Sequence, residues 1–63
     1  MTLGFRSQAG HWLEVELTLN ADGRWLAVVT SVSPEERRYG DTAGEALRDA
    51  ARWIDNTQPA DPR

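Results

Sequence analysis

Residues 39–54 of this chain read YGDTAGEALRDAARWI, and this stretch predicts the helix around which the rest of the fold is arranged. Thr42 is a favourable N-cap residue and Glu45 follows three positions later, so the two form a capping box in which each side chain bonds a free backbone N–H. The apolar residues then recur at spacings of three and four, as on one stripe of a helix: Ala43, Ala46, Leu47, Ala50 and Ile54. We therefore expect a helix that begins here and lies with this stripe on a sheet.

The chain before the helix predicts a first hairpin. Residues 12–19 alternate in the manner of a half-buried strand, with one side formed by Leu13, Val15, Leu17 and Leu19. The other side is formed by Trp12, Glu14, Glu16 and Thr18. Residues 2–7 alternate as a short edge strand, and a three-residue turn at 8–10 sets Phe5 opposite Leu13 and Leu3 opposite Val15. The apolar sides of the two strands then coincide.

Asp22-Gly23 predicts a second hairpin, because both central positions of a type I′ turn need a positive φ. With these residues as a two-residue turn, the expected opposite pairs are Leu19 with Leu26, Leu17 with Val28, Val15 with Thr30, and Leu13 with Val32. The third strand then runs from Arg24 to about Ser33 and ends at Pro34, which cannot donate to a central ladder. Residues 37–39 lead back towards the sheet before Gly40.

These elements predict an α+β fold, a three-stranded antiparallel meander with one C-terminal helix packed on one face (βββα). Residues 1–57 form this single domain, and residues 58–63 form a flexible C-terminal tail. The chain has 63 residues and no cysteine, so its core must hold it together without a disulfide or a thiolate metal site. It has no apolar run of membrane-spanning length and no signal-peptide pattern, so we expect a cytoplasmic protein.

The charge is mildly acidic. Ten acidic residues against seven basic ones give a formal net charge of −3, and every basic residue is Arg. This balance argues against generic affinity for the nucleic-acid backbone or for anionic lipid. We therefore expect neither direct nucleic-acid binding nor membrane binding.

A family resemblance rests on two short groups of residues. Gly23, Trp25 and Ala27 follow one another through the second hairpin, and Gly40-Asp41-Thr42 with Glu45-Ala46-Leu47 open the helix. In these positions the chain resembles the small HicB-like antitoxin domain, over roughly residues 12–54. The resemblance implies an inhibitor that binds and masks a small RNA-cleaving toxin. In general character, though not by motif, the chain is also similar to a phage anti-CRISPR protein that imitates nucleic acid.

The polar side of the predicted sheet is the first candidate for partner binding. Glu14 and Glu16 lie beside each other there, and Trp12, Trp25 and Val29 are expected on the same face. Carboxylates can replace phosphates and speed association, while aromatic rings supply buried area. The expected partner is a basic nucleic-acid-handling protein, either a toxin nuclease or a CRISPR effector subunit. The plain alternative is an ordinary solvated sheet face.

Acids in the predicted turns are further candidates for partner contact: Asp22, Glu35 and Glu36. Glu35 and Glu36 precede Arg37 and Arg38, a self-neutralising run that also suits a solvated loop. His11 is the sole histidine and has no serine placed with it in a triad-like pattern, so we expect no catalytic residue. We also expect no metal site and no cofactor.

Two other classes of function stay open. A small nucleic-acid-binding module would use its arginines: Arg6, Arg24, Arg37 and Arg38. A structural subunit would instead assemble through the edge strand at residues 2–7, which Arg6 protects only in part. The sequence is compatible with a monomer or a homodimer.

Overall fold

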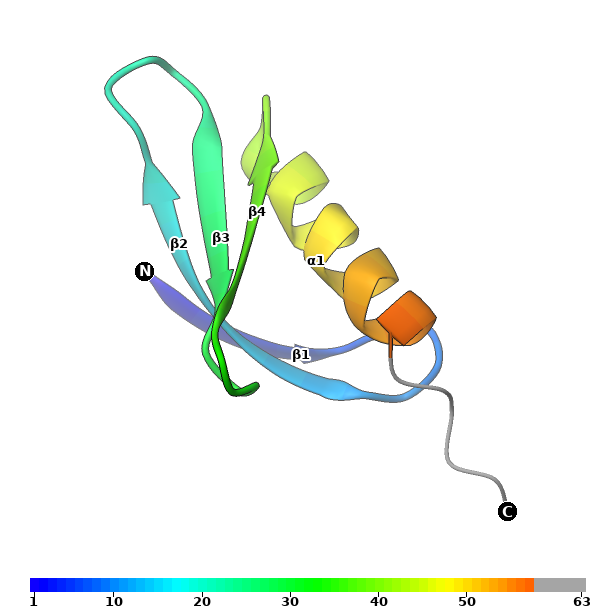
Figure 1. Ribbon diagram of the computed structural model, residues 1–63. Coiled ribbons are helices and arrows are strands. Elements are labelled where there is room, and N and C mark those ends of the chain that lie inside the picture. Colours follow the sequence, from blue (N-terminus) through cyan, green and yellow to red (C-terminus); the bar gives the residue numbers. More distant parts are fainter. Residues whose placement is uncertain (58–63) are drawn as a thin grey trace.

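The computed structural model describes residues 1–57, so the tail predicted at 58–63 lies outside the described residues. Its elements, in chain order, are β1 Thr2–Arg6, β2 Trp12–Leu19, β3 Trp25–Val29, β4 Glu36–Gly40 and α1 Ala43–Thr57. The strands form one antiparallel sheet in the order β1-β2-β3-β4, and α1 lies across one face of it (Figure 1). The predicted α+β class, a meander with one helix, is confirmed. The prediction of three strands is wrong.

The additional strand, β4, forms from the segment that follows Pro34. Its sequence, ERRYG, lacks apolar alternation. Its inner side chains Glu36 and Arg38 lie beside the helix and form ion pairs, with Arg38 Nη1 2.7 Å from Glu36 Oε2 and Arg38 Nε 2.7 Å from Asp49 Oδ2. A strand whose inner face is made of paired charges gives no hydrophobic signal. Glu36 therefore does not lie in the solvated loop that its sequence favours.

The first hairpin has the predicted register. Leu3 lies opposite Val15 and Phe5 lies opposite Leu13. The turn closes through a hydrogen bond from Ser7 N to His11 O of 2.8 Å, and Gly10 adopts a φ of 94°. The three residues between them form the turn that was expected.

The second hairpin differs from its prediction by one residue. Leu17 lies opposite Ala27 and Val15 opposite Val29, and the turn closes from Asn20 N to Arg24 O at 2.8 Å. Gly23 has a φ of 88°, and no residue other than glycine has a positive φ in the described chain. A type I′ turn would need a positive φ at Asp22 as well, and Asp22 does not have one. The chain instead repeats the three-residue turn of the first hairpin.

This shift exchanges the two faces of β3. Ala27 and Val29 are buried in the core, whereas Leu26 and Val28, predicted to point inward, lie on the opposite face and are half-buried. A one-residue change of register moves every side chain of a strand to the other side of the sheet. Leu19, also predicted inward, is 54% exposed at the last pair before the turn.

The helix begins as predicted. Thr42 Oγ1 accepts a hydrogen bond from Glu45 N at 3.1 Å. The Glu45 carboxylate accepts one from Asp41 N at 3.1 Å, one residue earlier than the capping box predicts. Gly40, directly before this cap, is buried so closely against the helix that a Cβ there would lie 2.5 Å from Ala46 N. The strand-to-helix junction thus depends on a capped turn and on a residue without a side chain.

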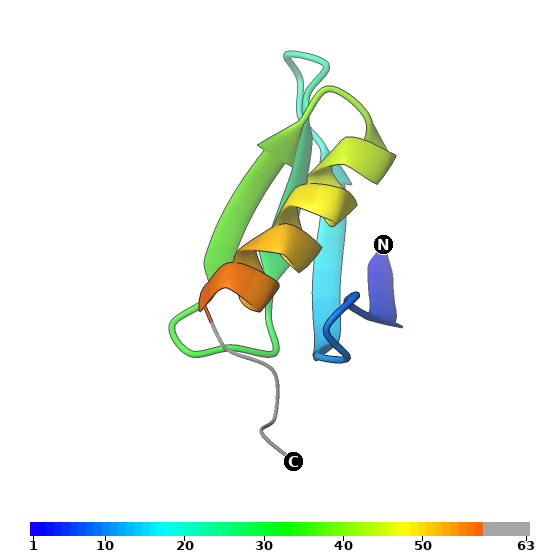
Figure 2. The same ribbon diagram turned by 90° about the vertical axis from the view of Figure 1, so that its right-hand side faces the viewer.

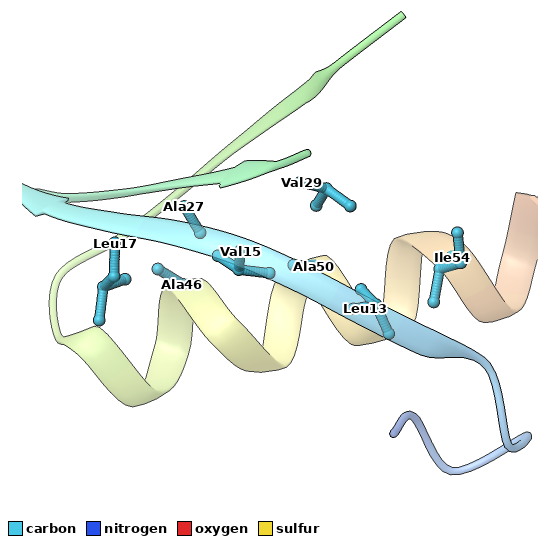
Figure 3. Packing of buried hydrophobic residues seen from close by; sticks show 8 residues of the cluster. All are labelled: Leu13, Val15, Leu17, Ala27, Val29, Ala46, Ala50 and Ile54. Carbon is cyan, nitrogen blue, oxygen red and sulfur yellow. The ribbon is translucent and has the colours of Figure 1, made fainter. Parts of the chain in front are cut away.

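The core lies between β2, β3 and α1. Its buried side chains are Leu13, Val15, Leu17, Ala27, Val29, Ala46, Ala50 and Ile54 (Figure 3). The predicted helix stripe supplies the last three of these residues. Figure 2 shows α1 crossing the sheet over β4, β3 and β2, with β1 to the side of the helix. The inner side chains of β1, Leu3 and Phe5, are accordingly only half-buried.

Candidate protein-binding face

The sheet face opposite α1 is the candidate site, and we call it the outer face. No other element of residues 1–57 covers it (Figure 1). By strand register it is formed by Thr2, Gly4 and Arg6 of β1, Trp12, Glu14, Glu16 and Thr18 of β2, Leu26 and Val28 of β3, and Arg37 and Tyr39 of β4.

The structure brings together only part of the predicted site. Trp12, Glu14 and Glu16 share the outer face as expected. Trp25 and Val29 were predicted there and lie on the inner face, packed in or against the core. This correction follows from the register of the second hairpin.

The predicted acids outside β2 do not join this group. Asp22 lies in the β2–β3 turn, where its Oδ1 accepts a hydrogen bond from Arg24 N at 3.0 Å. Glu35 lies in the β3–β4 loop at the other end of the sheet (Figure 1). Glu36 points to the inner face and pairs with Arg38.

The two central carboxylates differ in their surroundings. Glu16 accepts hydrogen bonds from the Met1 ammonium at 2.7 Å and from Thr2 Oγ1 at 2.8 Å. These contacts, the ammonium first, hold the pKa of Glu16 below its ordinary value. Glu14 is exposed, and among the described residues its carboxylate has no ion pair or hydrogen bond. Glu14 therefore offers its charge to a partner, whereas Glu16 offers a charge already compensated in part.

Aromatic rings mark two places on this face. Trp12 is 52% exposed and its indole crosses Gly4, so that a Cβ on Gly4 would lie 2.6 Å from the ring. Arg6 lies over the same ring at 6.0 Å and donates to Gly10 O, so it forms no ion pair with Glu14. Tyr39, on the opposite edge strand, is 48% exposed, with Arg24 5.7 Å from its ring.

Sequence reasoning missed three apolar members of the face: Leu26, Val28 and Tyr39. Every residue of β3 is apolar, so alternation cannot tell its two sides apart. A usable signal was present in the turn, because Asn20 and Gly23 occupy the first and last positions of a four-residue segment. Asn at the first and Gly at the last position is the preference of a type I turn. That turn predicts the observed register.

A polar cluster away from the outer face joins the β1–β2 turn to the end of α1. Asp55 accepts hydrogen bonds from Ser7 Oγ at 2.5 Å and Ala9 N at 3.2 Å, and its Oδ1 lies 3.0 Å from His11 Nδ1. These contacts, Ser7 first and then His11, lower the pKa of Asp55. Ser7, 8% exposed, directs its proton to the carboxylate and not to the imidazole. The cluster fastens the turn to the helix and is not arranged as a nucleophile with its base.

A groove of about 390 Å³ runs between β4 and α1. Acids and arginines both line it, namely Arg24, Asp41, Glu45, Arg48, Asp49 and Arg52, together with Tyr39 and Gly40. Mixed charge of this kind favours neither an anion nor a cation. Within residues 1–57 no three potential metal ligands converge, and no helix there is long and apolar enough to cross a membrane.

Comparison with known proteins returned no matching family model, no matching curated protein and no matching solved structure.

Proposed function

We propose that this protein is a non-enzymatic inhibitor that binds a basic nucleic-acid-handling protein through its outer face. The observation that carries the proposal is the exposed, unpaired carboxylate of Glu14 next to the half-exposed ring of Trp12 on a sheet backed by a helix. A rigid face of this kind offers charge for attraction and an aromatic anchor for buried area.

Two further features support this use of the face. Leu26 and Val28 lie between the two exposed aromatic residues and extend the apolar area across the middle of the sheet. The core and the helix cap fix the backbone of this surface, so little order needs to be gained on binding. The partner in this proposal is a toxin nuclease or a CRISPR effector subunit, met in the cytoplasm. The first corresponds to the HicB-like resemblance, and the second to a phage inhibitor that imitates nucleic acid.

The experiment is affinity capture of a nuclease or nucleic-acid-binding protein from the host, followed by measurement of its activity and of Kd by calorimetry. We expect the wild-type chain to inhibit the captured protein, with a Kd that weakens as salt rises. Glu14→Arg should raise Kd by about tenfold or more, because it places like charge against a basic surface. Trp12→Ala should raise it by a similar factor through lost buried area.

The matched control is Glu35→Arg, which makes the same charge change in a loop away from the outer face. It should leave Kd within about twofold, since loop charges at a distance are screened. If Glu14→Arg and Trp12→Ala bind and inhibit as the wild type does, the outer face is not the contact and the proposal fails.

A second candidate, a nucleic-acid-binding module, is favoured by one observation. Each exposed ring of the outer face has an arginine over it, Arg6 over Trp12 and Arg24 over Tyr39. Rings and guanidinium groups on an open sheet can bind single-stranded nucleic acid. A mobility-shift measurement at low salt distinguishes the two candidates. An inhibitor that imitates nucleic acid should not retain DNA or RNA, whereas the module should.

A further inference from the structure

The strand order leaves β1 and β4 as the two edges of the sheet. The hydrogen bonds of the first hairpin show which groups of β1 are already used. Leu17 N donates to Met1 O at 2.7 Å, and Ser7 N donates to His11 O at 2.8 Å. Alternate residues of an antiparallel strand direct their backbone groups to opposite sides. The N–H and C=O groups of Thr2, Gly4 and Arg6 therefore face the open edge.

The two edges differ in their protection. On β4 the inner side chains Glu36 and Arg38 are charged, and α1 packs beside them. Inward-pointing charges are one means by which proteins prevent pairing at an edge. β1 lies to the side of the helix (Figure 2), and its inner side chains, Leu3 and Phe5, pack against the core but stay half-buried. Of the two edges of the sheet in residues 1–57, β1 alone combines free backbone groups with half-buried apolar side chains on its inner face.

We infer that β1 pairs with β1 of a second copy of this chain, antiparallel, around a two-fold axis at Gly4. In this register Gly4 lies opposite the partner's Gly4, and Thr2 lies opposite the partner's Arg6. All three residues with free backbone groups then bond across the axis, and two sheets become one continuous sheet of eight strands. Closed two-fold symmetry of this kind is the commonest arrangement of homo-oligomers.

The side chains fit this register on both faces. On the inner face Leu3 meets the partner's Phe5 in a pair without backbone bonds, where side chains approach most closely. The two half-buried apolar residues of β1 thereby cover each other across the axis.

On the outer face the partner's Arg6 lies next to Thr2, whose hydroxyl binds Glu16. Glu16 and that Arg6 are two strands apart, about 10 Å by strand spacing. An Arg6 side chain that turned away from Gly10 O would span this distance to Glu16, so the register is also compatible in charge. At the axis Gly4 has no side chain to clash, and the Trp12 ring that crosses it meets its symmetry mate.

The interface is small, since it consists of five residues of one strand from each protomer. Contacts below about 1,200 Å² are typical of weak association, so we expect a Kd in the micromolar range. The contact shares the Trp12 ring with the outer face but does not use Glu14, so Glu14→Arg tests the inhibitor function without altering the strand interface.

The test is sedimentation equilibrium of the chain from about 1 µM to about 1 mM, a range that brackets this Kd. The mass should rise from 7.1 kDa towards twice that value.

Chemical synthesis supplies the variant Gly4→N-methylglycine, which removes the N–H facing the open edge and keeps the bonds between β1 and β2. This variant should remain monomeric. The matched control is N-methylation of the Arg37 amide, which faces the open edge of β4, and it should dimerise as the wild type does.

A second measurement does not depend on any variant. In a mixture of isotope-labelled and unlabelled wild-type chains, an isotope-filtered nuclear Overhauser experiment should detect contact between Leu3 methyl protons and Phe5 ring protons of different protomers. A chain that stays at 7.1 kDa throughout the concentration range would overturn the inference. So would a dimer that survives methylation at Gly4 and is lost by methylation at Arg37.

Discussion

Two glycines in edge strands, Gly4 of β1 and Gly40 of β4, are almost equally crowded by neighbouring atoms. The kind of atom that crowds them differs. A Cβ on Gly4 would lie 2.6 Å from the Trp12 indole, and a Cβ on Gly40 would lie 2.5 Å from Ala46 N. The indole is the end of a side chain that can turn away, whereas the amide belongs to the helix backbone. The comparison shows that β4 and α1 are packed backbone to backbone, while β1 is an edge that adjusts through side chains.

The remaining contacts of the two strands agree with this difference. Arg38, two residues before Gly40 in the chain, joins β4 to α1 through its hydrogen bond to Asp49. The β1–β2 hairpin meets the helix at its turn, where Ser7 and Ala9 bond Asp55. The β4 edge therefore contacts α1 along its length, whereas the hairpin that contains β1 is bonded to α1 only at its turn.

The largest effect should come from Gly40→Ala. The new methyl group would force the helix away from β4, because the backbone of residues 45 and 46 stands in its place. We expect a loss of at least about 2 kcal/mol in the free energy of unfolding, measured by urea denaturation.

Gly44→Ala is the matched control, since it adds the same methyl group at an exposed helix position with no atom nearer than 3.9 Å. It should stabilise the protein by up to about 1 kcal/mol through helix propensity. Equal effects of the two substitutions would contradict the close packing of β4 on the helix.

A smaller effect is expected from Arg38→Ala, which removes an ion pair within β4, to Glu36, and the ion pair that joins β4 to Asp49 of α1. Because these side chains are about one-third exposed, solvent screens the pairs, and we expect a loss of about 1 kcal/mol. A double-mutant cycle with Asp49→Ala isolates the contact. A coupling energy of zero would mean that this pair does not hold β4 to the helix.

The attachment of the β1–β2 turn should be sensitive to acid. The pKa of Asp55 is lower in the folded protein than in the unfolded chain, so its contribution to stability is present above the unfolded pKa. This contribution is lost as the pH falls below about 4 and through the folded pKa. Asp55→Asn should reduce the fall of Tm between about pH 5 and pH 2.

Ser7→Ala serves as the control for this effect, because Ser7 makes the largest contribution to the lowered pKa of Asp55. Carbonyl NMR titration should find a higher Asp55 pKa in that variant. An unchanged value would assign the lowered pKa to other contacts.

The smallest effect should come from Gly4→Ala. Rotation of the Trp12 side chain relieves the contact, so we expect a change in unfolding free energy below about 1 kcal/mol. The ring should nevertheless leave its place over residue 4, which NMR shifts of the β1 amides would report. A loss as large as that of Gly40→Ala would show that the Trp12 ring is as immobile as the helix.

Sequence reasoning succeeded where a local rule was sufficient. The capping residues Thr42 and Glu45, the spacing of the helix stripe, and the alternation of residues 12–19 each depend on neighbours in the chain. For the same reason the first hairpin and the placement of Trp12, Glu14 and Glu16 on one face could be predicted.

It failed where two local rules competed or where no hydrophobic signal existed. The pair Asp22-Gly23 suits a two-residue turn, and the segment Asn20 to Gly23 suits a three-residue turn, so Trp25 and Val29 were placed on the wrong face. In β4, Glu36 and Arg38 point inward, and their partner Asp49 becomes visible only when the helix lies beside them.

The amino-acid sequence by itself determined the capped helix, the first hairpin and the acidic side of β2, because each follows from periodicity and capping between near neighbours. Only the tertiary structure decided the register of β3, the existence of β4 and the presence of Tyr39 and Val28 on the outer face. Those features depend on which turn lets Ala27 and Val29 reach the helix, and on charges that find their partners across the fold. Packing over long separations in the chain selects among alternatives that local preferences leave nearly equal.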